Sequence, residues 1–364
     1  MKRVLFITNY PSPYRVNFYD ELGKNIDVTV LFADRVEKKV TRDAAWYEES
    51  RGGFRMVQLK KRIATFRGRD LCADVTEWVK KDFDAIVVCG YSSPTAVLAM
   101  AYMRLHKNPF YMEVDGGLIR PDSRLKYLIK KFLVTLPNAW ISSGRFTTKY
   151  LTHYGADESK IAYYPFSSLW ERDIPAAVPT QAEKQALRRK LGITEKKMVI
   201  SVSRFIASKR LDMLIRSGAA LGRDVGVYII GGEPTEEYLQ IRKELGADNV
   251  HFVGFTKKDR LAEYYRAADL FALPTRTDVW GLVINESMAY GLPVITTDRC
   301  VAGLELIESG KNGQIIPVDD QDALTEAIRS TLDGDCAAMG AAALETIRPY
   351  TIENMAKAHV EIFS

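Results

Sequence analysis

The sequence predicts an α/β fold built from two doubly wound parallel sheets, and three observations lead to it. Short apolar runs alternate with stretches of helical spacing, this pattern restarts after Gly192, and residues 165–179 between the two halves have no periodic pattern. Alternating strands and helices place successive strands in one parallel sheet with helices on both faces. Each half is therefore expected to form one Rossmann-like domain.

The first half opens with strand candidates at residues 4–8 and 26–32, and a helical pattern at residues 16–23 separates them. Further short apolar runs of this kind are typical of buried strands. They lie at residues 85–89, 110–114 and 139–142. We assign residues 1–166 to this domain and residues 167–184 to a linker.

The second half repeats the alternation. Its strand candidates lie at residues 198–202, 227–230, 251–253, 270–273 and 294–296, with helical patterns at 211–221 and 284–290. We assign residues 185–348 to this domain. Residues 349–364 end in helical spacing from Ile352 to Phe363, and this C-terminal helix could pack back on the first domain.

Composition excludes several classes of protein. The chain has 364 residues, of which 47% are hydrophobic and 27% charged, an ordinary globular mixture rather than a disordered or collagen-like one. Four cysteines without a C-x-x-C pair and four histidines without metal-ligand spacing argue against disulfides and a zinc site. We therefore expect a reducing, cytoplasmic compartment.

Charge is unevenly distributed along the chain. The net charge of +5 divides into +9 for residues 1–166 and −4 for residues 167–364. The basic half could face anionic lipid, a phosphorylated acceptor or nucleic acid. Nucleic acid is the weakest of the three, because the sequence has no nucleic-acid-binding motif or interleaved aromatic and basic pattern.

The loop after the strand candidate 270–273 is the first place to look for a site, because ligands bind at the carboxyl ends of parallel strands. Asp278 and Glu286 are separated by seven residues, and Gly281 precedes a helical pattern. The free amides of Leu282 and Val283 at a helix start would attract an anion. Alternatively, the two carboxylates could merely satisfy local backbone groups.

A second basic loop follows the strand candidate 198–202. It contains Arg204 and Lys209, which offer a planar fork of donors and a point charge to phosphate groups. Alone, such a loop could simply be solvated. Together with the helix start at Gly281, it predicts a cradle for a diphosphate.

These residues resemble the family 4 glycosyltransferases, retaining enzymes of the GT-B fold with two Rossmann-like domains that face a central cleft. The resemblance spans most of residues 199–320. It rests on Ser203-Arg204…Lys209, Ile229-Ile-Gly-Gly-Glu233, His251-Phe-Val-Gly-Phe255, Asp278-x-x-Gly281-Leu-Val-x-x-Glu286, Gly291-Leu-Pro-Val-Ile295 and Gly310-x-Asn312-Gly313.

The resemblance implies a role for each matched residue. Arg204 and Lys209 would bind the donor diphosphate in place of a metal, Asp278 would contact the sugar, and Glu286 would bind the ribose. The backbone of Gly281, Leu282 and Val283 would hold phosphate or sugar oxygens, and Gly254 and Phe255 would lie beside the base. The family usually has Glu at the position of Asp278, which here is one methylene shorter.

The first half offers candidates for the acceptor side. Residues 10–15, with Tyr14 and Arg15, resemble a subset that acts on surface polysaccharides or glycolipids. Arg15 could reach a phosphate or the acceptor, or it could cap the neighbouring helix. Asp115, at a strand end, could orient the acceptor hydroxyl or stabilise positive charge on the sugar ring, with Glu113 as a competing candidate.

Residues 123–136 predict an amphipathic helix. Its apolar face would comprise Leu125, Leu128, Ile129, Phe132, Leu133 and Leu136, with Arg124, Lys126, Lys130 and Lys131 opposite. Such a helix can lie on an anionic membrane surface. For the apolar residues themselves, however, we expect packing on the sheet, which would leave a solvated basic face. In either case the basic side could meet lipid headgroups, so we expect a peripheral protein at the inner face of the cell membrane.

Taken together, the resemblance implies a retaining hexosyltransferase with no bound metal and no cofactor. Its donor would be a nucleotide-diphosphate sugar, foremost a UDP-sugar, and its acceptor a glycan or a polyprenol-diphosphate-linked glycan. Two alternatives stay open, a nucleotide-sugar epimerase of the same architecture and a non-catalytic nucleotide-sugar or glycan-binding protein.

Overall fold

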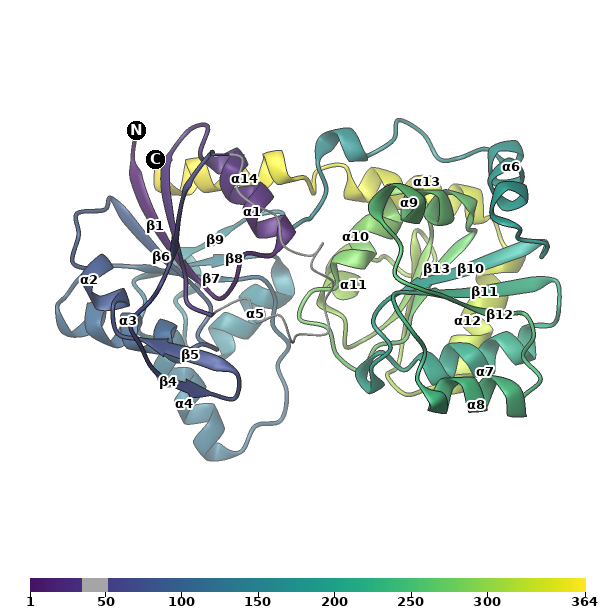
Figure 1. Cartoon of the computed structure of the whole chain (residues 1–364), viewed down its shortest axis with the longest axis horizontal. Coiled ribbons are helices and arrows are strands. Elements are labelled where there is room, and N and C mark those ends of the chain that lie inside the picture. The colour runs from purple at the N-terminus through teal and green to yellow at the C-terminus, as the bar shows by residue number, and fades with distance from the viewer. Residues whose placement is uncertain (35–51) are drawn as a thin grey trace. The chain divides into compact units, whose positions relative to one another are not determined.

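The computed structural model describes residues 1–34 and 52–364, and these residues form two compact units (Figure 1). The first unit comprises Met1–Ser168 and Tyr350–Ser364, and the second comprises Leu169–Pro349. The chain thus leaves the first unit after Ser168 and returns to it for its last helix.

The first unit contains a seven-stranded sheet in the order β3-β2-β1-β6-β7-β8-β9, and every neighbouring pair is parallel. Its central strands are apolar and buried, as strands covered on both faces must be. The strands are β1 (Arg3–Thr8), β2 (Asp27–Phe32), β3 (Arg55–Gln58), β6 (Ala85–Cys89), β7 (Tyr111–Val114), β8 (Ala139–Ser142) and β9 (Ile161–Tyr163).

Helices connect these strands, and a small antiparallel hairpin stands apart from the sheet. The hairpin is β4 (Arg62–Phe66) and β5 (Arg69–Cys72). The helices are α1 (Pro13–Leu22), α2 (Val75–Trp78), α3 (Pro94–Leu105), α4 (Arg124–Val134) and α5 (Arg145–His153).

The last helix, α14 (Ile352–Phe363), belongs to the first unit. It packs beside α1, where His359 lies 4.7 Å from the Phe18 ring and Phe363 lies 6.2 Å from the Phe6 ring between centroids. The residues that α14 buries are the apolar ones of its helical pattern, together with His359.

The second unit contains a six-stranded parallel sheet in the order β12-β11-β10-β13-β14-β15. The strands are β10 (Lys197–Val202), β11 (Val225–Ile230), β12 (Val250–Val253), β13 (Leu270–Leu273), β14 (Val294–Thr297) and β15 (Gly313–Ile316). The helices are α6 (Gln181–Leu191), α7 (Leu211–Leu221), α8 (Glu236–Glu244), α9 (Lys258–Ala267), α10 (Leu282–Ala289), α11 (Val301–Leu306), α12 (Gln321–Asp333) and α13 (Cys336–Ile347).

Local sequence signals explain where the first helix of this unit begins and ends. At the start of α6, Thr180 and Glu183 form a capping box, each side chain accepting from the other residue's backbone N–H. Gly192 ends the helix with φ 73°, a left-handed conformation that glycine adopts without strain. This is the glycine after which the alternation of the sequence restarts.

The predicted strands and helices are confirmed, with small shifts of their ends. The sequence patterns predicted neither the hairpin β4–β5 nor the edge strands β3, β9 and β15, and they assigned no helix at α2, α5, α6, α8, α9, α11, α12 or α13. Among residues 1–34 and 52–364, no helix is long and apolar enough to cross a membrane.

One expectation about packing is wrong. The apolar face of α4 does not pack on the sheet, because Leu125, Leu128, Ile129 and Phe132 are all exposed. The helix instead packs through its last turn, where Leu133 and Val134 are buried.

Candidate functional site

The second sheet reverses its direction of growth between β10 and β13, which are neighbours although β11 and β12 come between them in the chain. Ligands of doubly wound sheets bind at the carboxyl ends of strands beside such a switch point. The loop after β10 holds Arg204 and Lys209, and the loop after β13 holds Asp278. The topology therefore brings these predicted residues to one edge of the sheet.

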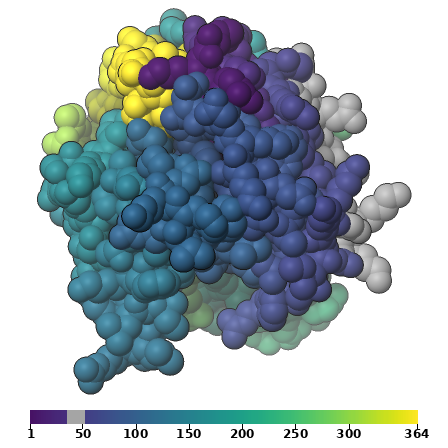
Figure 2. All heavy atoms as spheres, turned by 90° about the vertical axis from the view of Figure 1, so that its left-hand side faces the viewer, coloured from purple at the N-terminus to yellow at the C-terminus, as the bar shows by residue number. Residues whose placement is uncertain are grey.

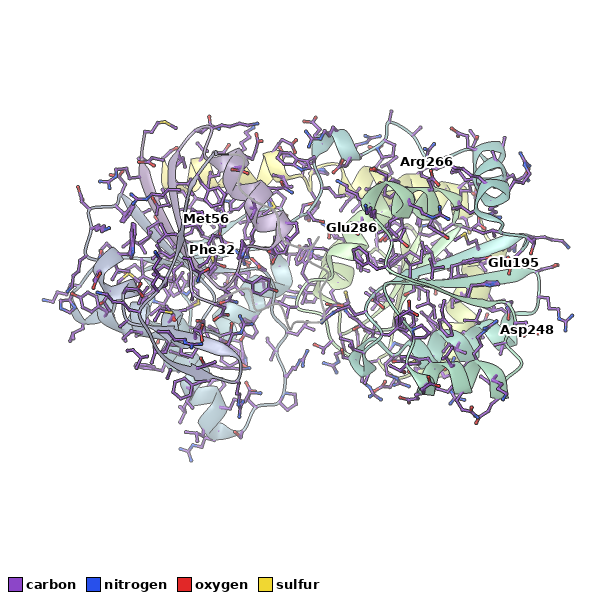
Figure 3. The ribbon with its side chains drawn as sticks, viewed as in Figure 1. Phe32, Met56, Glu195, Asp248, Arg266 and Glu286 are labelled. Carbon is purple, nitrogen blue, oxygen red and sulfur yellow. The ribbon has the colours of Figure 1, made fainter. Side chains whose placement is uncertain are left out.

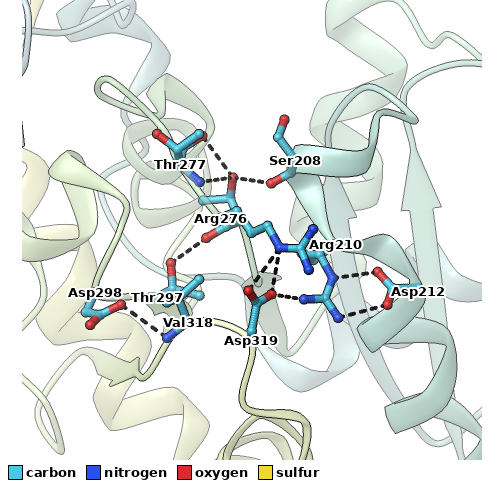
Figure 4. Close-up of polar contacts among 10 residues, drawn as sticks. Ser208, Arg210, Asp212, Arg276, Thr277, Thr297, Asp298, Val318 and Asp319 are labelled. Atoms are coloured by element: carbon cyan, nitrogen blue, oxygen red, sulfur yellow. Dashed lines mark hydrogen bonds and ion pairs between the residues drawn. The ribbon is translucent and has the colours of Figure 1, made fainter. Parts of the chain in front are cut away.

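The two loops are joined by hydrogen bonds. The Arg276 N–H donates to the Ser208 carbonyl at 2.8 Å, and the Thr275 hydroxyl donates to the same carbonyl at 3.1 Å. The Thr297 hydroxyl at the end of β14 donates to the Thr275 carbonyl at 2.6 Å. Figure 4 shows this network, which fixes the loops relative to each other.

A group of charged side chains reinforces the same junction. Arg210, in the left-handed conformation with φ 52°, binds Asp212 through two N···O contacts of 3.0 Å and also pairs with Asp319. Asp319 in turn accepts from Arg276 at 2.9 and 3.0 Å (Figure 4). The sequence patterns did not indicate this group, because Asp319 joins it from a distant segment of the chain.

Lys209 and Asp278 form an ion pair across the junction, between Nζ and Oδ2. Their side chains are only 13% and 21% exposed, so the pair is largely sheltered from water. Arg204 differs, because its side chain is exposed. The structure thus brings Lys209 and Asp278 into contact, whereas Arg204 is an exposed residue.

Gly281 begins α10 with φ 105°, a conformation that side-chain-bearing residues rarely adopt. A Cβ atom at this position would lie 2.8 Å from Sγ of the buried Cys300. The Cys300 thiol donates to the Trp280 carbonyl at 3.2 Å, and the Trp280 ring nitrogen donates to Asn285 at 2.9 Å. This packing holds the first turn of α10, with the amides of Leu282 and Val283, at the edge of the site.

Glu286 lies half-buried on α10, toward the carboxyl end of the sheet (Figure 3). Its Oε2 accepts from the Tyr265 hydroxyl at 3.3 Å. Burial, followed by the nearby Glu286 charge, raises the pKa of Tyr265 well above its usual value, so this hydroxyl stays protonated and can donate. Tyr265 is itself fixed by a stacked ring contact with Tyr290, with centroids 5.2 Å apart.

Gly254 and Phe255 follow β12, two strands from the switch point, and Phe255 is 55% exposed. Between them and Arg204 lies the glycine turn after β11. There a Cβ on Gly231 would lie 2.2 Å from the Ser203 carbonyl oxygen, so only glycine lets the two loops approach this closely. Gly231 therefore allows the loop after β11 to pack directly against the loop after β10.

The acceptor-side candidates cluster in the first unit. Nη2 of Arg15 contacts Oδ2 of Asp115 at 2.5 Å, and Nη1 lies 3.6 Å from Oε1 of Glu113. Arg15 is therefore held by these two carboxylates, neither capping a helix nor free. Tyr14 packs edge-on against Phe166, with centroids 5.6 Å apart.

Further members of this cluster come from distant segments. The Tyr164 hydroxyl donates to Oδ1 of Asp115 at 2.9 Å, and Nε2 of His359 on α14 lies 3.2 Å from Oε2 of Glu113. Burial opposes ionisation of Glu113, but His359 and Arg15 outweigh it and hold its pKa below the usual value. No local sequence signal links His359 to Glu113, because 246 residues separate them.

Among the residues that the structure describes, no group of three or more His, Cys, Asp and Glu side chains is arranged to hold a metal ion.

Comparison with known proteins finds a family model that matches part of the second unit. Residues 183–346 match the family model described as glycosyl transferases group 1. This range contains every donor-side residue named above.

Curated relatives match part of the chain. It is 34% identical over 184 residues to the GDP-mannose-dependent alpha-(1-6)-phosphatidylinositol monomannoside mannosyltransferase of Mycolicibacterium smegmatis, covering 47% of this chain and 48% of the relative. It is 32% identical over 175 residues to the D-inositol 3-phosphate glycosyltransferase of the same organism, covering 46% of this chain and 40% of the relative. The chain spans about half the length of the curated relatives it matches.

Solved structures resemble the whole chain. Anabaena Alr3699/HepE in complex with UDP superposes with a TM-score of 0.76 at 18% identity, covering 99% of this chain and 98% of that one. Sucrose-phosphate synthase from Thermosynechococcus elongatus superposes with a TM-score of 0.75 at 18% identity, covering 100% and 98%. At this identity the likeness shows the fold, and the predicted GT-B fold is confirmed.

Proposed function

We propose, on the premise that residues 183–346 form a domain of the glycosyl transferases group 1 family, that this protein transfers a hexose from a nucleotide-diphosphate donor to a hydroxyl group. The acceptor would be a glycan or a lipid-linked glycan. The observation that carries the proposal is the junction at the β10/β13 switch point, where Lys209 contacts the loop that leads into the Gly281 start of α10.

The donor diphosphate would bind at this junction. An ammonium group has three N–H donors, so Lys209 can keep its bond to Asp278 and still donate to phosphate oxygens. The exposed guanidinium of Arg204 adds a planar fork, and the first amides of α10 have no partner within the helix. Together these groups would stabilise the charge that develops on the leaving phosphate without a catalytic metal.

The other donor-side residues would bind the sugar and the nucleoside. Asp278 would accept from sugar hydroxyls while Lys209 holds it in place, and Glu286 would accept from the ribose. Gly254 and Phe255 would border the base, where the exposed Phe255 ring offers an apolar face.

On the acceptor side we assign the catalytic role to Asp115 rather than Glu113. The Asp115 side chain is 19% exposed and that of Glu113 is 3% exposed, so Asp115 is the carboxylate that an acceptor hydroxyl can reach. Arg15 and Tyr164 would position it, each through one hydrogen bond.

Thermal-shift measurements with nucleotide sugars test the donor. The predicted donor is a UDP-sugar, and the names of the mannosyltransferase relatives make GDP-mannose the second candidate. A ligand at 100 times its dissociation constant adds about 2.7 kcal/mol to the free energy of unfolding. A stabilising shift with one of these donors supports the proposal, and no shift with either would contradict it.

Arg204→Ala tests the diphosphate assignment in a turnover assay. Losing one charge-assisted contact to the leaving group should slow transfer by about 10²–10³. Arg216→Ala, another exposed arginine of the same unit on α7, is the matched control and should keep the wild-type rate. An incubation without acceptor separates transfer from epimerisation, because only an epimerase would convert the donor sugar on its own. Activity in the presence of EDTA tests metal independence. The anomeric configuration of the product, measured by NMR, tests retention.

A further inference from the structure

Helix α4 exposes a continuous apolar stripe. Leu125, Leu128, Ile129 and Phe132 are 69%, 51%, 51% and 63% exposed, and we call them the α4 ridge. Their spacing of three and four residues places them on one face of the helix. In Figure 1, α4 lies at the lower edge of its unit, and Figure 2 shows the blue-green segment around it projecting from the surface.

The ridge cannot turn inward, because the opposite face of α4 is anchored. Lys130 pairs with Asp122 at 2.8 Å, and the Trp140 ring nitrogen donates to the Val134 carbonyl at 2.9 Å. Leu133 and Val134 are buried beneath the helix. The outward direction of the ridge is therefore a fixed feature of the fold.

Positive charges border the ridge on both sides. By helical position, Arg124 and Lys131 flank one side and Lys126 flanks the other, and α4 itself contains no acidic residue. The neighbouring Asp122 is already paired with Lys126 at 2.9 Å and with Lys130. An apolar stripe between cations suits a surface that is apolar inside and anionic at its rim.

A cavity of about 590 Å³ adjoins the first turn of α4. Its lining combines cationic, aromatic and apolar side chains with one carboxylate, that of Asp122, which Lys126 and Lys130 already pair. The other lining residues are Ile119, Arg120, Pro121, Arg124, Tyr127 and His153. The exposed Arg124 offers a planar fork of donors to the phosphate of a lipid headgroup, and the exposed Ile119 offers an apolar contact to the start of its acyl chain.

We propose that the α4 ridge docks this protein on an anionic phospholipid leaflet. The ridge side chains enter the boundary between headgroups and acyl chains, and Arg124 and Lys131 meet the headgroup phosphates. A second copy of the chain is a poorer occupant, because pairing two ridges would bring their flanking cations together. The inference goes beyond the proposed function and does not depend on it.

Co-sedimentation of the full chain with vesicles tests the proposal. We expect binding to vesicles of phosphatidylcholine mixed with phosphatidylglycerol and little binding to phosphatidylcholine alone. The double variant Leu128→Ser/Phe132→Ser should bind the anionic vesicles at least tenfold more weakly. The control is Leu239→Ser, which changes an exposed leucine on α8 of the other unit and should bind like the wild type.

The charged flank is tested separately. Arg124→Glu/Lys131→Glu should weaken binding to anionic vesicles and reduce its dependence on salt. Equal binding by the wild type and both double variants, or equal binding of the wild type to both kinds of vesicle, would overturn the proposal. The proposal would also be overturned if light scattering showed that the wild type is a dimer and that Phe132→Ser makes it a monomer.

A label on the ridge gives a second readout that does not require loss of binding. An environment-sensitive dye on Phe132→Cys should shift its emission to the blue when anionic vesicles are added, whereas the same dye on Leu239→Cys should not. An unchanged spectrum at position 132 would contradict insertion. Nucleotide-sugar thermal shifts on the same samples keep failure of the membrane proposal distinct from failure of the proposed function.

Discussion

At the scale of single residues, the candidate site depends on contacts that reach across the chain. Lys209 and Asp278 meet although 69 residues separate them, and Cys300 packs under Gly281. Lys209, Asp278 and Gly281 thus each have a defined neighbour that folding brings from another segment. Single substitutions can therefore separate a structural role from a role in binding.

Gly281→Ala is expected to destabilise the second unit and to weaken donor binding. Holding a non-glycine residue in a left-handed conformation costs about 1–2 kcal/mol, and the new Cβ would also meet Cys300. Urea denaturation measures the loss. Gly254→Ala is the control, since its Cβ would meet no atom closer than 3.7 Å, and it should change stability by less than about 0.5 kcal/mol. A Gly281→Ala variant as stable as the wild type would show that the left-handed start of α10 is dispensable.

The thiols are expected to be unreactive in the folded chain. Burial raises the pKa of Cys300 and of Cys89 to about 12, and it also raises the pKa of Cys72 and Cys336. Since the thiolate is the nucleophile, little of it exists at pH 8, and reaction with a disulfide reagent should accelerate as pH rises. The native chain should react slowly at pH 8 and release four equivalents after denaturation. Fast native reaction of two or more thiols would contradict these pKa directions.

At the scale of elements, the C-terminal helix α14 stabilises a unit whose other elements all lie before Ser168, far ahead of it in the chain. It fills the space over α1 with Met355, His359 and Phe363, and it delivers His359 to Glu113 in the acceptor-side cluster. Its helical pattern is plain in the sequence, but its partner is not, because apolar spacing identifies a buried face without saying what covers it.

Phe363→Ala is expected to destabilise the first unit by about 3–5 kcal/mol, the usual cost of truncating a buried phenylalanine. The exposed Glu361 on the same helix provides the control, and Glu361→Ala should change stability by less than about 0.5 kcal/mol. Chemical denaturation followed by far-ultraviolet circular dichroism measures the loss. If the two variants unfold alike, α14 does not stabilise the first unit.

At the scale of the whole molecule, both units contain carboxylates that folding keeps ionised. In the second unit, Glu195 lies at the amino end of the sheet, away from Glu286 (Figure 3). Its Oε1 lies 2.5 Å from Nε2 of His251, and its Oε2 accepts from Tyr228 at 2.9 Å. Burial opposes its charge, but these bonds outweigh burial and lower the pKa of Glu195. Glu113 has the same direction of shift in the first unit.

These shifts predict acid sensitivity. A carboxyl group with a lowered pKa in the folded state stabilises the fold above its unfolded pKa of about 4.3, and this contribution is lost as pH falls through the folded pKa. The free energy of unfolding should therefore decrease below about pH 4. Glu195→Gln should lower stability at pH 7 and flatten the acid dependence, whereas the exposed Glu361→Gln should do neither. Equal slopes for Glu195→Gln and the wild type would refute the assignment.

The sequence by itself determined the two doubly wound halves and the loops that carry Arg204, Lys209, Asp278, Gly281 and Glu286. These features follow from local periodicity, from glycines in special conformations, and from the rule that ligands bind where strands end. Only the tertiary structure decided which groups meet and which faces stay exposed. Lys209 pairs with Asp278, Arg15 joins Asp115, His359 reaches Glu113, and the α4 ridge faces solvent. Such pairings depend on strand order and on helix packing between distant segments, so local sequence patterns do not predict them.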